Sequence, residues 1–146
     1  MTADDKAQEL GVDLKAFTPP GNLAPATRVG NTIYTSGYTS VGIKGKLGQD
    51  LTVEQGYEAA KLTLLNALAI AKQELGSLDR ITRVVRMSGH VASAEGFTQQ
   101  PAVLNGASDL LVQIFGEAGR HARLALGAAE LPLNMAIELE LILQVM

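Results

Sequence analysis

The residues best suited to chemistry lie in the last third of the chain, where an arginine and two glutamates stand among apolar residues. Arg123 belongs to a run of small and aliphatic residues, and Glu138 and Glu140 belong to a second run near the C-terminus. Both runs alternate with period two, which is typical of β-strands and places residues two apart on one face. If the strands pair through the turn at 131–134, a guanidinium and a carboxylate line one pocket.

Arg123 is the strongest candidate because its neighbours are small rather than charged. A guanidinium binds a carboxylate through two parallel hydrogen bonds and stays charged when partly buried. The alternative is a structural salt bridge to Glu138 or Glu140 across the sheet, since structural ion pairs produce similar patterns. The spacing leaves these two interpretations equally open.

Glu140 has the right chemical type for a general base, because a carboxylate among apolar neighbours can orient a water and accept its proton. The alternative is a solvent-facing polar position on a strand. For Glu138 this solvent-facing interpretation is favoured, because one catalytic carboxylate is enough.

Three further side chains are weaker candidates. His121 shares the face of Arg123 and is either a pocket residue or a residue at a helix-to-strand junction. Ser36 and Asn105 can each donate a hydrogen bond to an oxyanion or an amine, although such residues are more often a strand hydroxyl and a helix-surface amide. Gly106 inside a predicted helix is costly and suggests a close backbone approach.

Other familiar kinds of site are disfavoured. The chain has no cysteine, and His90 and His121 have no further ligands at metal-binding spacing. No glycine-rich phosphate loop precedes a helix, and no serine lies in a nucleophile elbow. We therefore expect neither a metal nor an organic cofactor.

The composition points to one globular domain over residues 1–146, with residues 1–20 as an N-terminal arm. Hydrophobic residues make up 47% and charged residues 18% of the chain, which favours a large apolar core. The net charge of -3 and the scarcity of aromatic residues argue against nucleic-acid binding. The polar N-terminus and the lack of a run of about 20 apolar residues predict a cytoplasmic protein without a membrane span.

Local patterns predict the elements that position these residues. Residues 26–36 read as two strands around a Gly30-Asn31 turn, and residues 41–47 as a short edge strand or an exposed loop. A capping box at 52–55 starts a long helix that ends at Gly76, and its apolar stripe runs over about six turns. A strand at about 80–91, a helix at about 99–117 and two C-terminal strands follow.

This order, with only two long helices, predicts an α+β fold in which both helices pack on one face of a single sheet. The other sheet face then needs cover from a second subunit or a ligand.

Four segments of the chain together resemble the RidA (YjgF) family of enamine and imine deaminases. They are Ile33-Tyr-Thr-Ser-Gly37, Leu104-Asn-Gly-Ala-Ser-Asp-Leu-Leu, Phe115-Gly-Glu-Ala-Gly-Arg-His-Ala-Arg123 and Ala129-Glu-Leu-Pro followed by Ile137-Glu-Leu-Glu140. The resemblance runs from about residue 20 to the C-terminus. It implies a chorismate-mutase-like fold with a single mixed sheet, and a homotrimer whose pockets lie in the clefts between subunits.

The resemblance also implies roles for individual residues. Arg123 matches the arginine that binds the substrate carboxylate, and Glu140 matches the carboxylate that positions the hydrolytic water. Ser36 and Asn105 match pocket positions. The implied reaction is hydrolysis of small 2-imino or 2-aminoacrylate-type acids to 2-keto acids and ammonia, without a cofactor.

The sequence departs from the family pattern at three places. Leu23 stands where the deaminases have a tyrosine in the proline-rich arm, and Ala125 stands where many members have a cysteine. Gly37-Tyr38-Thr39 replaces the usual Gly-Gln-hydrophobe. The alternative function is therefore a non-catalytic protein that binds a carboxylate metabolite in the same cleft.

Overall fold

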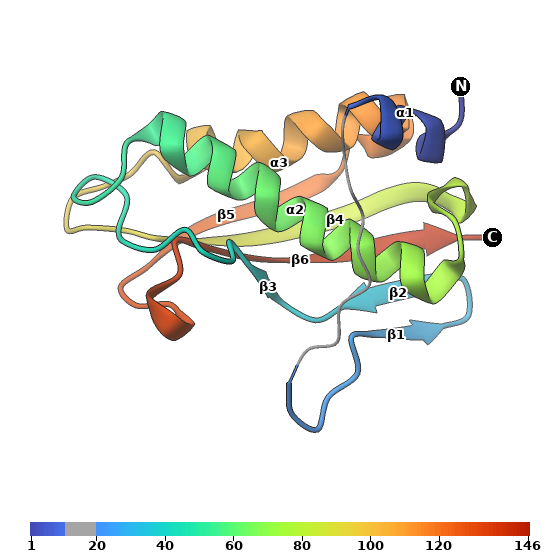
Figure 1. The fold of residues 1–146 in the computed structure, drawn as a ribbon, viewed down its shortest axis with the longest axis horizontal. Helices are drawn as coiled ribbons and strands as arrows, with labels where there is room; N and C mark the ends of the chain where they lie inside the picture. The colour runs from blue at the N-terminus through green and yellow to red at the C-terminus, as the bar shows by residue number, and fades with distance from the viewer. Residues whose placement is uncertain (11–19) are drawn as a thin grey trace.

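The computed structural model describes residues 1–10 and 20–146, and in this part of the chain helices cover one face of a mixed sheet (Figure 1). The strands are β1 (Ala26–Val29), β2 (Thr32–Thr35), β3 (Tyr38–Thr39), β4 (Ile81–Ala92), β5 (Ala122–Ala128) and β6 (Ile137–Val145). The helices are α1 (Ala3–Glu9), α2 (Val53–Leu75) and α3 (Gln100–Phe115). Short 3-10 turns lie at Leu78–Arg80 (η1), Gly116–Gly119 (η2) and Pro132–Asn134 (η3). The α+β architecture predicted from the sequence is confirmed.

The ends of α2 follow directly from the sequence. The Thr52 hydroxyl accepts a hydrogen bond from the Gln55 amide at 3.2 Å, and the Gln55 side chain accepts one from the Thr52 amide at 2.9 Å. At the other end Gly76 takes the left-handed conformation with φ 85°, which a glycine adopts without steric cost. The predicted capping box and helix stop are both confirmed.

Helices α2 and α3 pack closely because a glycine lies at their crossing. A Cβ atom at Gly106 would lie 2.0 Å from the carbonyl oxygen of Tyr57. Backbone atoms of α2 thus occupy the space that a side chain would need. The expected close approach at Gly106 is confirmed, and it sets the position of α3 above the sheet.

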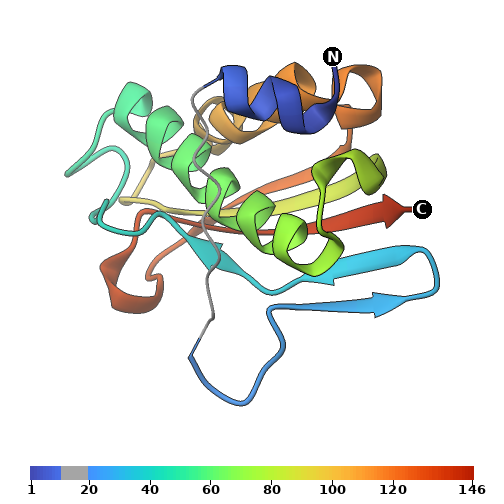
Figure 2. The same ribbon diagram turned by 45° about the vertical axis from the view of Figure 1, so that its right-hand side comes forward.

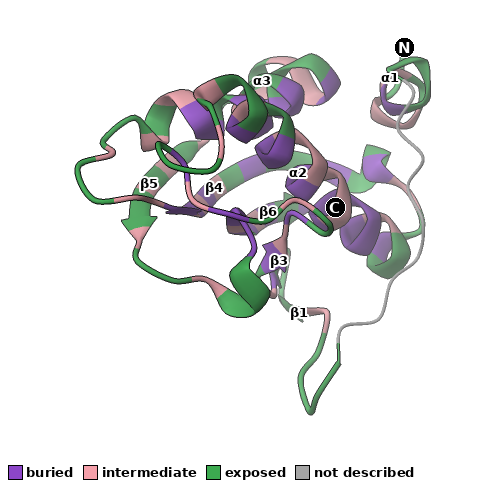
Figure 3. Ribbon diagram, turned by 60° about the vertical axis from the view of Figure 1, so that its left-hand side comes forward, coloured by how far each residue is buried: buried purple, intermediate pink, exposed green. Residues whose placement is uncertain are grey.

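The sheet has one face covered by the helices and one open face. Along β6, Ile137, Leu139 and Leu141 are buried beneath the helices, while Glu138 and Glu140 point to the opposite side. Figures 2 and 3 show both long helices on the same side of the sheet, with the buried residues gathered between the two layers. The open face carries the exposed side chains of Leu124 and Leu126, so it has the uncovered apolar surface that the sequence predicts.

The strand order is β1-β2-β6-β4-β5, with β3 also paired to β6. The pairing of β5 with β6 on which the single-pocket hypothesis depended does not form, because β4 lies between them. The segment β4-α3-β5 is a crossover unit, and such units place their two strands side by side and parallel. β4 and β5 are indeed parallel, with Met87 opposite Arg123.

Residues 41–47 form an irregular loop rather than an edge strand, so the loop interpretation holds. Gly42 and Gly45 have φ values of 86° and 111°, which break extended structure. The Ser40 hydroxyl donates to the Ile43 carbonyl and closes a turn. The third strand is instead the two-residue β3, just before this loop.

The N-terminal arm begins with the short helix α1, which packs beside α3 in Figure 1. Asp4 fixes it: its carboxylate accepts hydrogen bonds from the Ser77 hydroxyl and the Leu78 amide. Partial burial raises the pKa of Asp4, but these hydrogen bonds and the Lys72 charge together outweigh burial and lower it. Residues 11–19, in the second half of the predicted arm, lie outside the described residues.

Candidate functional site

Arg123 lies on β5 and points to the helix side of the sheet. Its register partner on β4 is Met87, which pairs in turn with Leu141 of β6, and both are buried beneath the helices. From this position the guanidinium reaches α3. Nη1 of Arg123 donates to the Asn105 side-chain oxygen at 2.8 Å and to the Ser108 hydroxyl oxygen at 3.1 Å.

Arg123 makes no ion pair with any carboxylate among the described residues. Glu138 and Glu140 lie on the other face of the sheet, so the alternative interpretation, a salt bridge to either of them, does not hold. The carboxylate next to Ser108, that of Asp109, instead accepts a hydrogen bond from the Tyr57 hydroxyl at 2.7 Å, which raises the pKa of Tyr57. The half-buried guanidinium therefore has neutral partners and retains an uncompensated positive charge.

His121 is held between η2 and β5 by one hydrogen bond at each ring nitrogen. Nδ1 lies 2.6 Å from the Gly119 carbonyl oxygen, and Nε2 lies 2.9 Å from the Ser108 hydroxyl oxygen. A carbonyl only accepts, so Nδ1 carries a hydrogen. In the neutral ring Nε2 is then the acceptor, and Ser108 donates its proton to it.

These side chains line a shallow hollow of about 240 Å³, which we call the arginine hollow. It is lined by Asn105, Ser108, Val112, Arg120, His121 and Arg123. Three residues singled out from the sequence, Arg123, Asn105 and His121, thus come together. His121 is also a junction residue, so both of its interpretations hold.

A second, smaller hollow lies on the open face, and we call it the carboxylate hollow. Its volume is about 90 Å³ and its lining is Gly37, Ser88, His90, Glu138, Leu139 and Glu140. Glu138 is half-buried and its side chain lies against Gly37, where a Cβ atom would be 3.2 Å from the Glu138 carboxyl carbon. Glu140 is exposed and lies opposite Ser88.

Within one chain the two hollows lie on opposite faces of the sheet. The expected single pocket for Arg123 and Glu140 therefore does not form in the described part of one subunit. The physical reason is the strand order, because β4 lies between β5 and β6. Arg123 pairs through Met87 with Leu141 and shares its face of the sheet. Glu140 pairs through Ser88 with Leu124 and lies on the opposite face.

Ser36 and Leu23 lie outside both hollows. The Ser36 hydroxyl donates to the Ala24 carbonyl at 2.7 Å, and the Tyr38 hydroxyl donates to the Pro25 carbonyl at 2.8 Å. These bonds fasten the end of the arm to the sheet. Leu23, just before this fastened segment, is 51% exposed.

Ser108 is a lining residue of the arginine hollow with chemical capacity that the sequence reasoning missed. It lies three residues after Asn105 on α3, and residues three apart share a helix face. Because Asn105 was expected to line a pocket, this spacing could have identified Ser108 as a second lining residue.

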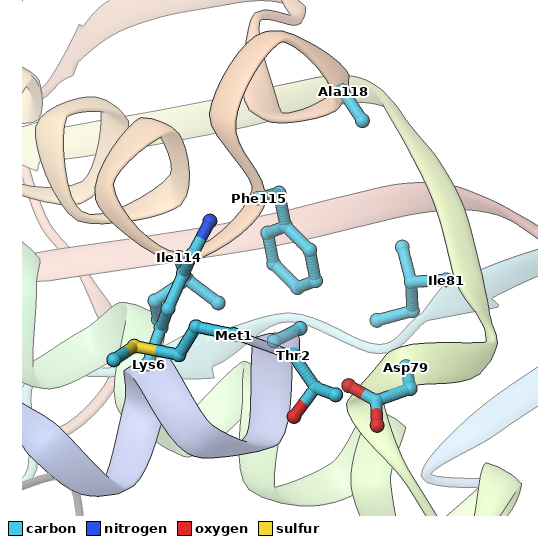
Figure 4. A pocket seen from close by; sticks show the side chains of 9 residues that line it. Met1, Thr2, Lys6, Asp79, Ile81, Ile114, Phe115 and Ala118 are labelled. Carbon is cyan, nitrogen blue, oxygen red and sulfur yellow. The ribbon is translucent and has the colours of Figure 1, made fainter.

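A larger hollow of about 340 Å³ lies where α1 meets α3 and the start of β4 (Figure 4). Ile81, Ile114 and Phe115 form its centre, and Lys6 and Asp79 stand on different sides of it. No set of hydrogen-bonded polar groups converges on one point there, unlike in the arginine hollow.

In the described part of the chain, no group of three or more potential metal-ligating side chains comes together. No helix within residues 1–10 and 20–146 is long and apolar enough to cross a membrane.

Comparison with known proteins places this geometry in a family. The family model described as "YjgF/chorismate_mutase-like, putative endoribonuclease" matches residues 8–144. The chain belongs to this family. The resemblance to the RidA (YjgF) family and the chorismate-mutase-like fold are therefore confirmed.

Individual family members extend this result. Protein TCP17 of Trypanosoma cruzi is 40% identical over 144 residues, which cover 94% of this chain and 90% of the relative. A solved structure from Shewanella oneidensis MR-1 is 36% identical, covers 99% of this chain and 100% of its own, and has a TM-score of 0.95. RidA from the Antarctic bacterium Psychrobacter sp. PAMC 21119 is 28% identical, with a TM-score of 0.60 and coverage of 91% and 96%.

Proposed function

We propose that this chain hydrolyses small 2-imino or enamine acids to 2-keto acids and ammonia. The observation that carries the proposal is the state of Arg123. Its guanidinium is half-buried at the wall of a hollow, and its hydrogen-bond partners among the described residues are neutral. A guanidinium held in this way binds a small carboxylate through charge-assisted hydrogen bonds.

The reaction also needs a group that accepts a proton from water, and the arginine hollow has no carboxylate. The carboxylate hollow has two, on the open face of the same sheet. The exposed Leu124 and Leu126 lie on that face and favour cover by a second copy of the chain. In a homotrimer with cyclic symmetry, the arginine hollow of one subunit would meet the carboxylate hollow of the next.

Glu138 and Glu140 are the two candidates for orienting the water. The family resemblance assigns this role to Glu140, and that assignment stays a prediction. The geometry supports Glu138 as its rival, because Glu138 is the less exposed of the two and lies against Gly37. A carboxylate that is partly withdrawn from solvent holds a water in a more defined position.

In the proposed reaction Arg123 fixes the substrate carboxylate, and the carboxylate of the neighbouring subunit orients water toward the imine carbon. Once the imine nitrogen carries a proton, the substrate carbon is strongly electrophilic, so positioning and fixed charge supply most of the remaining assistance. No residue role in this scheme calls for a metal or an organic cofactor.

The separation of the two hollows favours one rival function. A chain that does not assemble holds the carboxylate clamp without the water-orienting carboxylate. Such a protein binds a carboxylate metabolite and does not convert it. Degradation of RNA has weaker support, because the net charge of -3 opposes binding of a phosphate backbone.

The experiment is to generate 2-iminobutanoate enzymatically and to measure 2-ketobutanoate release with and without this protein. We expect release well above the spontaneous rate. A thermal-shift measurement with pyruvate runs in parallel, because a ligand that binds only the native state raises its melting temperature. Stabilisation by pyruvate without faster release would support binding alone and would reject the hydrolase.

A further inference from the structure

The hydrogen-bonded pair Ser108 and His121 lies next to Arg123 and has no role in the scheme above. The geometry points to a proton relay: His121 passes a proton through the Ser108 hydroxyl to the nitrogen of the substrate held by Arg123. This inference rests on the proposed function and makes Ser108 and His121 further catalytic residues of the same site.

The contacts set the direction of the relay. The Gly119 carbonyl fixes the hydrogen on Nδ1 of His121, so Nε2 is the nitrogen that gains and loses a proton. When Nε2 is protonated, it donates to the Ser108 oxygen, 2.9 Å away. The hydroxyl proton of Ser108 is then free to point into the hollow, toward a bound substrate.

Arg123 places the substrate within reach of this hydroxyl. Its Nη1 lies 3.1 Å from the Ser108 oxygen, and its Nη2 has no hydrogen-bond partner among residues 1–10 and 20–146. A substrate carboxylate bound at Nη2 lies beside Ser108. Because the imine nitrogen is attached to the carbon next to that carboxylate, it also lies on the Ser108 side of the hollow.

The chemistry of an imine requires such a proton source. A neutral imine becomes strongly electrophilic only when its nitrogen is protonated, and ammonia leaves only as a protonated nitrogen. Arg123 cannot supply the proton, because a guanidinium does not deprotonate in proteins. Histidine changes its protonation near neutral pH and is suited to this transfer.

The charged groups around His121 are mostly basic. Arg120 and Arg123 line the same hollow, and the Arg83 guanidinium on β4 donates to the Arg120 carbonyl. From α3, the Asp109 carboxylate is engaged by Tyr57. A bound substrate carboxylate thus brings a negative charge into a hollow whose charged side chains are basic.

The protons balance over one turnover. His121 gives one proton through Ser108 to the imine nitrogen, and water adds to the carbon while it loses one proton to the glutamate of the neighbouring subunit. In the resulting carbinolamine the hydroxyl proton moves to nitrogen as the C–N bond breaks, which leaves the 2-keto acid and ammonia. The glutamate returns a proton to solvent, and His121 takes one up.

The test compares wild-type protein with Ser108→Ala, Ser108→Thr and His121→Gln in the imine-hydrolysis assay across pH. The relay starts from a protonated imidazole, so it predicts a wild-type kcat that falls as pH rises. Ser108→Ala and His121→Gln should lower kcat about 100-fold and remove this pH dependence. Ser108→Thr keeps the hydroxyl and should recover most of the rate, and pyruvate should stabilise all four proteins equally.

The outcomes are separable. Absence of turnover by wild type would reject the proposed function and the relay with it. Turnover by wild type with an unchanged rate and pH profile in Ser108→Ala would overturn the relay alone. A loss of pyruvate binding in Ser108→Ala with the wild-type pH profile would also overturn it, because Ser108 would then only position Arg123.

Discussion

Replacing Arg123 by glutamine is expected to lower kcat/KM for imine hydrolysis about 100-fold and to abolish stabilisation by pyruvate. Hydrogen bonds to a charged group contribute about 1.5–3 kcal/mol each, and the substitution removes both the hydrogen bond that Nη2 offers and the positive charge. Arg123→Lys should recover only part of the loss, because an ammonium lacks the planar fork of the guanidinium. The rates and the pyruvate thermal shift are measured on the same preparations.

The matched control is Arg120→Gln, which removes the same charge from the rim of the same hollow. Arg120 is exposed, so its loss should change kcat/KM only slightly. The melting temperature of Arg123→Gln without ligand should stay close to that of wild type, since Arg123 forms no ion pair among the described residues. Equal effects of the two substitutions would show a general charge effect instead of a specific clamp.

Gly106→Ala is expected to destabilise the protein strongly, although alanine normally stabilises a helix relative to glycine. The new Cβ atom would lie 2.0 Å from the Tyr57 carbonyl oxygen, so α2 and α3 must separate. Overpacking of a core costs about 1–3 kcal/mol or more, and we expect about 3 kcal/mol. Urea unfolding of the variant and of wild type measures the difference.

Gln113→Ala is the matched control, because Gln113 is an exposed position on the same helix. Its stability should stay within about 0.5 kcal/mol of wild type, as for most surface substitutions. A Gly106→Ala protein that is as stable as wild type would contradict the tight crossing of α2 and α3. Because α3 carries Asn105, which holds the Arg123 guanidinium, Gly106→Ala should also weaken pyruvate binding.

Local signals in the sequence predicted most elements well. The capping box at Thr52, the stop at Gly76 and the Gly30 turn depend on a few neighbouring residues, and each forms as expected. Such features are set by hydrogen bonds and φ angles within one turn of chain. For residues 41–47 the sequence left two alternatives open, an edge strand and a loop. The few apolar positions in so short a segment fit both.

Strand order was the main failure, and it carried over to the site. The segment from β5 to β6 looks like a hairpin when it is read locally, with alternating residues around Pro132. The α3 crossover instead joins β4 to β5 and leaves β6 on the other side of β4. The alternation of faces along β5 and along β6 was predicted correctly. Which residues of β5 share a face with Glu138 and Glu140, however, depends on the register of both strands with β4.

The candidate site was predicted in part. Arg123, Asn105 and His121 were found because their types and faces are visible in the sequence, and they meet in one hollow. Ser108 was missed because serine is common on helices. Its importance depends on hydrogen bonds with His121 and Arg123, which are distant in sequence. Ser36 matched a pocket position, yet its hydroxyl in this chain holds the arm segment at Ala24.

The central claim is that catalysis needs the arginine hollow of one subunit and the carboxylate hollow of another. It is tested most directly by mixing two inactive variants, Arg123→Gln and Glu138→Gln, and allowing the subunits to exchange, with Glu140→Gln tested in the same way. In a cyclic trimer every mixed assembly restores one intact cleft, so equal mixing should recover about one quarter of wild-type activity. Activity that stays at the sum of the two separate variants would contradict the account.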